Sequence, residues 1–311
     1  MAVKTRVTEM LGIEKPIVQA AMGWIARAQL SSAVSNAGGM GIIETSSGEL
    51  DAVRDEIVRM RQLTDKPFGV NVAQAFVRDP DIVRFVIDQG VKFVTTSAGD
   101  PMKYTAMLKD AGLTVFHVVP NLAGALRAVE AGVDGLIVEG GEGGGFKNPK
   151  DVSTMVLVPQ VVEAVDVPVI AAGGIVDGRS MAAAFALGAE GVLMGTRILS
   201  SAESPVHDNW KQAIIDADAT DTVFLNRKGP GPALRALRTE RTSRLAAEGS
   251  PNIFGEFADT RRVYFEGDLE AGIALTGQVA GRIHEVKPVA QILDETMRDY
   301  AATVSRMAGG L

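Results

Sequence analysis

Val167-Pro-Val-Ile-Ala-Ala-Gly-Gly174 and Glu190-Gly-Val-Leu-Met-Gly-Thr-Arg197 are two short apolar stretches that each run into glycine. An apolar run without polar alternation is typical of a parallel strand that is covered on both faces. Glycine lacks a Cβ, so its backbone amide approaches a phosphate oxygen directly. In barrels of eight βα units, the loops after strands seven and eight often form a phosphate site. The pair therefore predicts the last two strands of such a barrel and a phosphate cup.

Six further candidate strands precede these two, and helical segments separate them. Strand and helix alternate at a spacing of roughly twenty to thirty residues, as successive βα units require. The sequence therefore predicts an α/β fold, a (β/α)8 TIM barrel. The expected strands are Ile17–Met22, Gly41–Glu44, Phe68–Val72, Phe93–Thr96, Thr114–Val118 and Gly135–Glu139. The expected helices are Ala26–Asn36, Leu50–Leu63, Asp79–Gln89, Pro101–Ala111, Leu122–Ala131, Val156–Val165 and Arg179–Leu187.

The chain has 311 residues, more than the roughly 250 of a plain barrel, and the surplus follows the eighth strand. Residues 205–262 mix charges, glycine and proline, and we predict that they form a small helical lid. Residues 1–204 and 263–311 would form the barrel and its closing C-terminal helices.

Composition excludes several classes of function. A net charge of −7 and the absence of a long tract of one charge sign argue against nucleic acid as a partner. No apolar run approaches the roughly twenty residues that span a membrane, and the first residues lack a signal-peptide core, so a cytoplasmic protein is expected. The chain has no cysteine and three scattered histidines, so neither a thiolate nor a metal site is expected. A bound organic cofactor is then the natural source of chemistry.

Other barrel chemistries lack the residues they need. No predicted strand ends in lysine, which a Schiff-base aldolase requires, and a covalent thioimidate needs cysteine. Glycoside hydrolysis remains formally open through Glu44 and Glu139 with Glu142, although the predicted mouth has no aromatic platform for a sugar. No G-x-G-x-x-G follows the first strand, so a resident nicotinamide-binding domain is not expected.

Several ordered motifs resemble the nitronate monooxygenases, formerly called 2-nitropropane dioxygenases, and the related flavin-dependent enoyl-thioester reductases. The resemblance covers the predicted barrel from end to end and implies a TIM barrel that binds FMN across its mouth. The matching stretches are Pro16–Gly23, Ala37–Ile42, Lys66–Asn71, Val138–Gly145, Ala171–Gly178, Gly195–Arg197 and Glu266–Gly281.

The resemblance also implies which residues hold FMN. Ala21, Met22 and Gly23 would pass beneath the ring system, Asn71 would bond its ring or ribityl edge, and glycine amides with a threonine hydroxyl would hold the phosphate. Met22 as core filler and Asn71 as a turn cap remain the ordinary alternatives. The complete expected set is Ala21, Met22, Gly23, Asn71, Glu139, Gly144, Gly145, Ala172, Gly173, Gly174, Gly195 and Thr196.

One position departs from the family. Where these enzymes carry a substrate-facing histidine after strand six, this chain has Phe146, which cannot move a proton. Phe146 would instead form an apolar wall of the substrate pocket, or pack on the barrel rim. His117, near the end of strand five, is the best substitute base, provided that strand alternation turns it into the barrel.

The activity that the resemblance implies is oxidation of an anionic carbon acid, a nitronate, through FMN with oxygen, because an ionised nitronate needs no base. An FMN-dependent enoyl-thioester reductase or acyl-CoA dehydrogenase and a non-catalytic flavin-binding barrel are the alternatives, with NAD(P)H as another co-substrate. The basic segment 227–244 would suit CoA phosphates, or would pair with the chain's own carboxylates. Assembly of identical chains stays open. The expected substrate contacts are Phe146, Lys147, Arg235, Arg238 and Gln278.

Overall fold

The computed structural model describes residues 3–229, 232–249, 255–257 and 259–310. Its main sheet contains eight parallel strands in the order β1-β9-β8-β6-β5-β4-β3-β2. The amide of Gln19 donates to the carbonyl of Met40 at 3.0 Å, and a bridge between Val18 and Met40 joins the two end strands. The sheet therefore closes into the predicted barrel. The strands are β1 (Ile17–Gln19), β2 (Gly41–Ile43), β3 (Phe68–Ala73), β4 (Phe93–Ser97), β5 (Thr114–Val119), β6 (Gly135–Glu139), β8 (Val169–Ala172) and β9 (Gly191–Met194).

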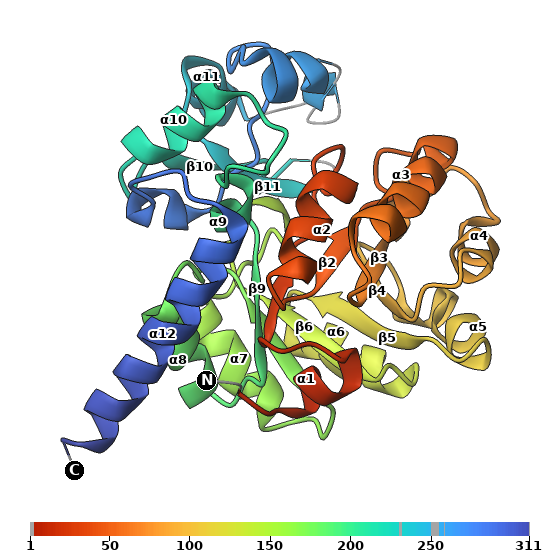
Figure 1. Cartoon of the computed structure of the whole chain (residues 1–311). Helices are drawn as coiled ribbons and strands as arrows, with labels where there is room; N and C mark the ends of the chain where they lie inside the picture. Colours follow the sequence, from red (N-terminus) through yellow and green to blue (C-terminus); the bar gives the residue numbers. More distant parts are fainter. Residues whose placement is uncertain (1–2, 230–231, 250–254, 258, 311) are drawn as a thin grey trace.

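Helices follow the strands around the outside of the barrel, as predicted (Figure 1). The barrel helices are α2 (Ala28–Asn36), α3 (Leu50–Leu63), α4 (Ile82–Asp88), α5 (Thr105–Asp110), α6 (Leu122–Glu130), α7 (Thr154–Val162), α8 (Gly178–Ala186) and α9 (Thr196–Leu199). Short 3-10 turns precede α4 and α5, namely η1 (Gln74–Phe76) and η2 (Pro101–Lys103). The sequence did not predict α1 (Arg6–Leu11), whose capping box is formed by Thr5 and Thr8.

Alternate residues of the strands fill the barrel interior. Phe93 and Phe116 meet edge to face with ring centroids 5.4 Å apart. Glycine at position 135 leaves room for the Phe116 ring, because a Cβ there would lie 2.4 Å from that ring. Apolar residues of α1, among them Val7 and Leu11, pack against the same interior cluster. The barrel is thus a packed core rather than a channel, which leaves the carboxyl ends of the strands as the place for a site.

The inserted segment is not wholly helical, which corrects the predicted lid. It contains α10 (Asp208–Asp216), β10 (Thr222–Leu225), β11 (Ala233–Leu237) and α11 (Glu240–Glu248). The two strands pair antiparallel, and β11 also pairs with β7 (Gly145–Lys147) from the loop after β6. The sequence hid β11 because its buried run contains Arg235. Residues 230–231, 250–254 and 258 of the predicted lid lie outside the described residues.

The C-terminal part returns to the barrel. After η3 (Gly255–Phe257), which still belongs to the insertion, it contains η4 (Arg262–Glu266), η5 (Gln278–Arg282) and the long helix α12 (Val289–Ala308). Figure 1 shows α12 running along the outside of the barrel beside α8. A Cβ at Gly178 would lie 2.1 Å from the amide nitrogen of Tyr300, so glycine lets these two helices approach closely. The tail thus contains one long helix, α12, preceded by the short turn η5.

Candidate active site at the barrel mouth

The glycines after β8 and β6 form a cradle made of backbone. Gly173 and Gly174 have φ values of +88° and +76°, in the left-handed region that favours glycine. A Cβ at Gly173 would lie 2.9 Å from the carbonyl oxygen of Gly140. Within the described residues, the amides of Gly144, Gly173 and Gly174 donate no hydrogen bond to the protein. Backbone amides without a protein acceptor suit an anionic group such as a phosphate.

The segment after the insertion completes this cradle. The amide of Gly277 donates to the Thr196 hydroxyl at 2.9 Å, and the amide of Gln278 donates to the carbonyl of Glu142 at 2.9 Å. A Cβ at Gly144 would lie 2.8 Å from the Gly277 nitrogen, so the two backbones touch. Thr196 starts α9 directly after Gly195, as the cup predicted from the sequence requires. Gln278 lies beside the cradle through its backbone, while its side chain is exposed.

Asn71 lies in the barrel end of β3. Its side-chain nitrogen contacts the Thr95 hydroxyl at 2.9 Å and the Thr95 carbonyl at 3.2 Å, which fixes the amide plane. The residue is 4% exposed and follows the interior alternation of β3. A fixed amide at this depth can hydrogen-bond one polar edge of a planar cofactor.

The loop after β1 carries Ala21, Met22 and Gly23. Ala21 packs on the interior cluster of the barrel, and the Met22 carbonyl accepts from the amide of Ala26 at 2.8 Å. A Cβ at Gly23 would lie 3.0 Å from the Ser46 hydroxyl. Trp24 has a φ of +60°, a backbone conformation that a large side chain seldom adopts. Such backbone strain concentrates at functional sites, and here it lies at the carboxyl end of a barrel strand.

Phe146 belongs to a group of three aromatic rings that we call the aromatic trio: Phe76, Phe146 and Phe257. The centroids of the Phe76 and Phe146 rings lie 4.9 Å apart, and those of Phe146 and Phe257 lie 5.6 Å apart. The three rings come from η1, β7 and η3. The sequence analysis missed Phe76 and Phe257, because both lie in short turns without a recognisable pattern. Phe146, in the loop after strand six, therefore has an aromatic ring against it from each of two other segments.

Lys147 and Glu139 form an ion pair beside the trio. The Lys147 ammonium lies 2.5 Å from the Glu139 carboxylate, and its side chain is 4% exposed. The ammonium also contacts the Phe146 carbonyl at 3.2 Å. Lys147 therefore has its charge matched within the protein, and so has Glu139.

His117 points away from the barrel interior. It shares a face of β5 with Val115 and Val119, which belong to the outer core, whereas Phe116 belongs to the interior cluster. Its Nδ1 lies 2.6 Å from the Thr96 hydroxyl. Burial lowers the pKa of His117 to about 4, against the opposing effects of a hydrogen bond to the Gly99 backbone and of the Asp100 charge. The prediction that His117 serves as the base has lost its geometric support.

The carboxylates that left glycoside hydrolysis open have structural partners. Glu44 is fully buried and pairs with Arg27 at 2.8 Å. Glu142 accepts from the amide of Thr154 at 3.0 Å and from its hydroxyl at 2.9 Å. Neither is poised as a free acid or base.

The basic segment is mostly paired with acceptors of the chain itself. Arg235 is buried in β11, where its guanidinium donates to the Gly141 carbonyl at 2.8 Å and the Thr222 hydroxyl at 3.1 Å. Arg227 lies 3.0 Å from Asp151. Arg238 contacts the carbonyls of Thr220 and Thr222, but its side chain stays 47% exposed. Of the two predicted phosphate contacts, Arg238 alone has an accessible guanidinium.

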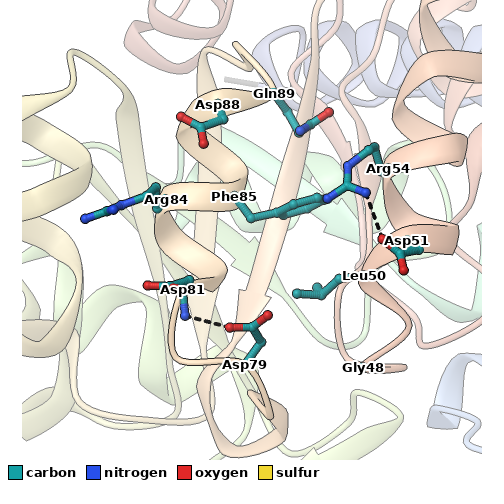
Figure 2. A pocket seen from close by; sticks show the side chains of 10 residues that line it. All are labelled: Gly48, Leu50, Asp51, Arg54, Asp79, Asp81, Arg84, Phe85, Asp88 and Gln89. Atoms are coloured by element: carbon teal, nitrogen blue, oxygen red, sulfur yellow. Dashed lines mark hydrogen bonds and ion pairs between the residues drawn. The ribbon is translucent and has the colours of Figure 1, made fainter.

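A cavity of about 480 Å³ lies between α3 and α4 (Figure 2). Arg54 pairs with Asp51 at 2.7 Å and lies over the Phe85 ring at 5.3 Å. The rim of this cavity includes Asp79, Asp81 and Asp88. Such an acidic rim does not suit an anionic substrate. Among the described residues no cluster of histidines and carboxylates could hold a metal ion. None of the helices in the same ranges is long and apolar enough to cross a membrane.

Comparison with known proteins adds the family. The nitronate monooxygenase profile matches residues 4–82 and 73–299, nearly the whole chain. The chain belongs to the nitronate monooxygenase family. Enzymes of this family are flavoenzymes, and the protein is an oxidoreductase. The resemblance inferred from the motifs is therefore confirmed.

Individual members of the nitronate monooxygenase family and related enzymes share much of this chain. A "(3aS,4S,5R,7aS)-5-hydroxy-7a-methyl-1-oxo-octahydro-1H-indene-4-carboxyl-CoA dehydrogenase" of Mycobacterium tuberculosis is 41% identical over 79% of this chain and 69% of its own. A probable nitronate monooxygenase of Staphylococcus saprophyticus is 33% identical over 73% of this chain and 76% of its own. The solved structure of FabK from Thermotoga maritima superposes with a TM-score of 0.92 at 43% identity, covering 99% of this chain and 100% of that one.

Proposed function

We propose that the protein binds FMN at the barrel mouth and oxidises an anionic carbon acid, such as an alkyl nitronate, with oxygen as the acceptor. The cofactor assignment is supported by the cradle of Gly144, Gly173 and Gly174, whose amides have no acceptor within the described residues and two of which leave no room for a Cβ. Thr196 adds a hydroxyl beside them. When bound, FMN would supply the electron transfer between substrate and oxygen.

The choice of an ionised substrate rests on the aromatic trio. Phe146 occupies the family's histidine position between Phe76 and Phe257, and none of the three can accept a proton. The neighbouring Lys147 is already paired with Glu139. A neutral nitroalkane would need a base to remove its α-proton, whereas a nitronate arrives without that proton. The residues of this chain would bind and orient the anion and keep water from it.

Anaerobic stopped-flow absorbance of the FMN-loaded protein tests this proposal. Propyl nitronate is expected to bleach the flavin band, and neutral nitropropane is expected to do so only in proportion to its ionised fraction. Bleaching by neutral nitropropane at a rate independent of its ionisation would reveal a base and overturn the argument. No bleaching with nitronate would reject the proposed substrate.

A second candidate is redox chemistry on an acyl thioester, with NAD(P)H as a further co-substrate. Its support is the similarity to the CoA dehydrogenase of Mycobacterium tuberculosis and to FabK. Arg238 would then contact the CoA phosphates, since its guanidinium is accessible. Mixing the oxidised protein with NADH or NADPH, and separately with a saturated acyl-CoA, distinguishes this candidate, because a nitronate oxidase would be reduced by neither.

A further inference from the structure

We infer that the aromatic trio is a specificity subsite that selects substrates with an extended apolar group, an inference that rests on the proposed function. The rings of Phe76, Phe146 and Phe257 enclose a junction of three segments that are distant in the sequence. All three residues are half-buried, so each ring keeps an accessible part.

The trio sits beside the proposed cofactor site through the chain itself. Phe146 directly follows Gly144 and Gly145, and Phe76 ends the turn that begins immediately after the strand carrying Asn71. We therefore expect a group bound between the glycine cradle and the Asn71 amide to contact these rings. Strand ends and their first turns are the positions from which barrel enzymes build substrate contacts.

The surroundings of the trio are apolar. Phe146 and Phe257 pack on an apolar cluster that the insertion shares with the segment after it, and its buried members include Leu234 and Ile273. The charged residue that follows Phe146, Lys147, is paired with Glu139, and the one that precedes Phe257, Glu256, is paired with Arg241. An uncharged alkyl or alicyclic group gains by leaving water here, whereas a short polar acid leaves the ring faces unused.

Phe257 makes the insertion part of the site. Its ring comes from η3 and lies against the ring of Phe146, which belongs to the loop after β6. The insertion therefore contributes to substrate choice, beyond covering the mouth. Substrates are predicted to be nitronates, or other planar anions, that carry a chain of several methylenes or a ring.

The test is a chain-length series on the FMN-loaded protein, using primary nitronates from ethyl to hexyl. Each added methylene is expected to raise kcat/KM about fourfold until the subsite is filled. Phe257→Ala and Phe76→Ala should each flatten this dependence, and Phe257→Leu should restore most of it. Phe185→Ala is the matched control, because it breaks an aromatic pair with Tyr300 between α8 and α12, away from the mouth.

Binding without turnover gives a second readout. Dissociation constants of butanoate to octanoate, measured by calorimetry with the FMN-loaded protein, should fall with length in the unmodified protein and in Phe185→Ala, but not in Phe257→Ala. If no nitronate reduces the flavin, the proposed function fails and the carboxylate series alone decides the subsite. A flat series in the unmodified protein, or an unchanged series in both trio variants, would overturn the inference.

Discussion

At the barrel mouth, the glycine cradle is formed by backbone, whereas the aromatic trio is formed by side chains. The glycine cradle consists of backbone from the loops after β8 and β6 and from the segment at Gly277, and a Cβ at Gly144 or Gly173 would strike neighbouring main chain. The aromatic trio consists of side chains from three separate segments. A substitution in the cradle must therefore move backbone, whereas a substitution in the trio changes side-chain contacts only.

The largest effect should come from filling the cradle. Gly173→Ala places a Cβ 2.9 Å from the Gly140 carbonyl at a φ of +88°, and it should weaken FMN binding about a thousandfold. Gly132→Ala is the control, since its φ is +86° and nothing lies within 4 Å of its Cβ. That variant should lose about 1–2 kcal/mol of stability and keep FMN binding. Equal FMN affinity in both variants, measured by fluorescence titration, would remove the cradle from the site.

His117 tests whether the mouth contains a titrating base. Its pKa is about 4 in the folded protein and 6.5 in the unfolded chain, so the unfolded state takes up the proton first as the pH falls. Stability should be unaffected by this group above pH 6.5 and should decline by about 3 kcal/mol on acidification to pH 4. His117→Gln should abolish that part of the decline in urea unfolding. The pH profile of flavin reduction should not change, and a change would return His117 to the mouth.

The next prediction concerns the ion pair between Lys147 and Glu139, which we expect to stabilise the loop after β6 that carries Phe146. Glu139→Gln leaves the nearly buried Lys147 ammonium without its partner and should cost about 2 kcal/mol of stability, discounted because Glu139 is 26% exposed. Replacing both residues, Glu139→Gln with Lys147→Met, should recover most of that loss in urea unfolding. If the single variant is as stable as the parent, the pair does not hold the loop after β6.

The smallest effect concerns the second candidate function. Arg238→Ala should raise the KM for an acyl-CoA about threefold and leave that for the pantetheine thioester unchanged, because an exposed guanidinium gains little from a phosphate in water. Arg244→Ala, which removes another exposed arginine from the same segment, is the control. An equal response to both thioesters would place the CoA phosphates elsewhere.

The order of strands and helices, the cradle and the family could be predicted from the sequence. Buried parallel strands are continuous apolar runs, helices end at glycine, and a phosphate cup made of backbone needs glycines at fixed places such as Gly173 and Gly174. These features depend on neighbours along the chain. The strand β11 was missed because Arg235, which finds buried acceptors only in the folded protein, interrupts its apolar pattern.

Only the tertiary structure decided which side chains lie at the proposed substrate site. Whether His117 faced the barrel depended on the phase of β5, and one residue of shift in a strand reverses every side chain. The aromatic trio joins Phe76, Phe146 and Phe257, which no local pattern connects. The sequence by itself determined a flavoenzyme-type barrel with a backbone cradle, because that information is local. What faces the substrate was decided by the packing of distant segments, because side-chain contacts form only once the barrel and the insertion have met.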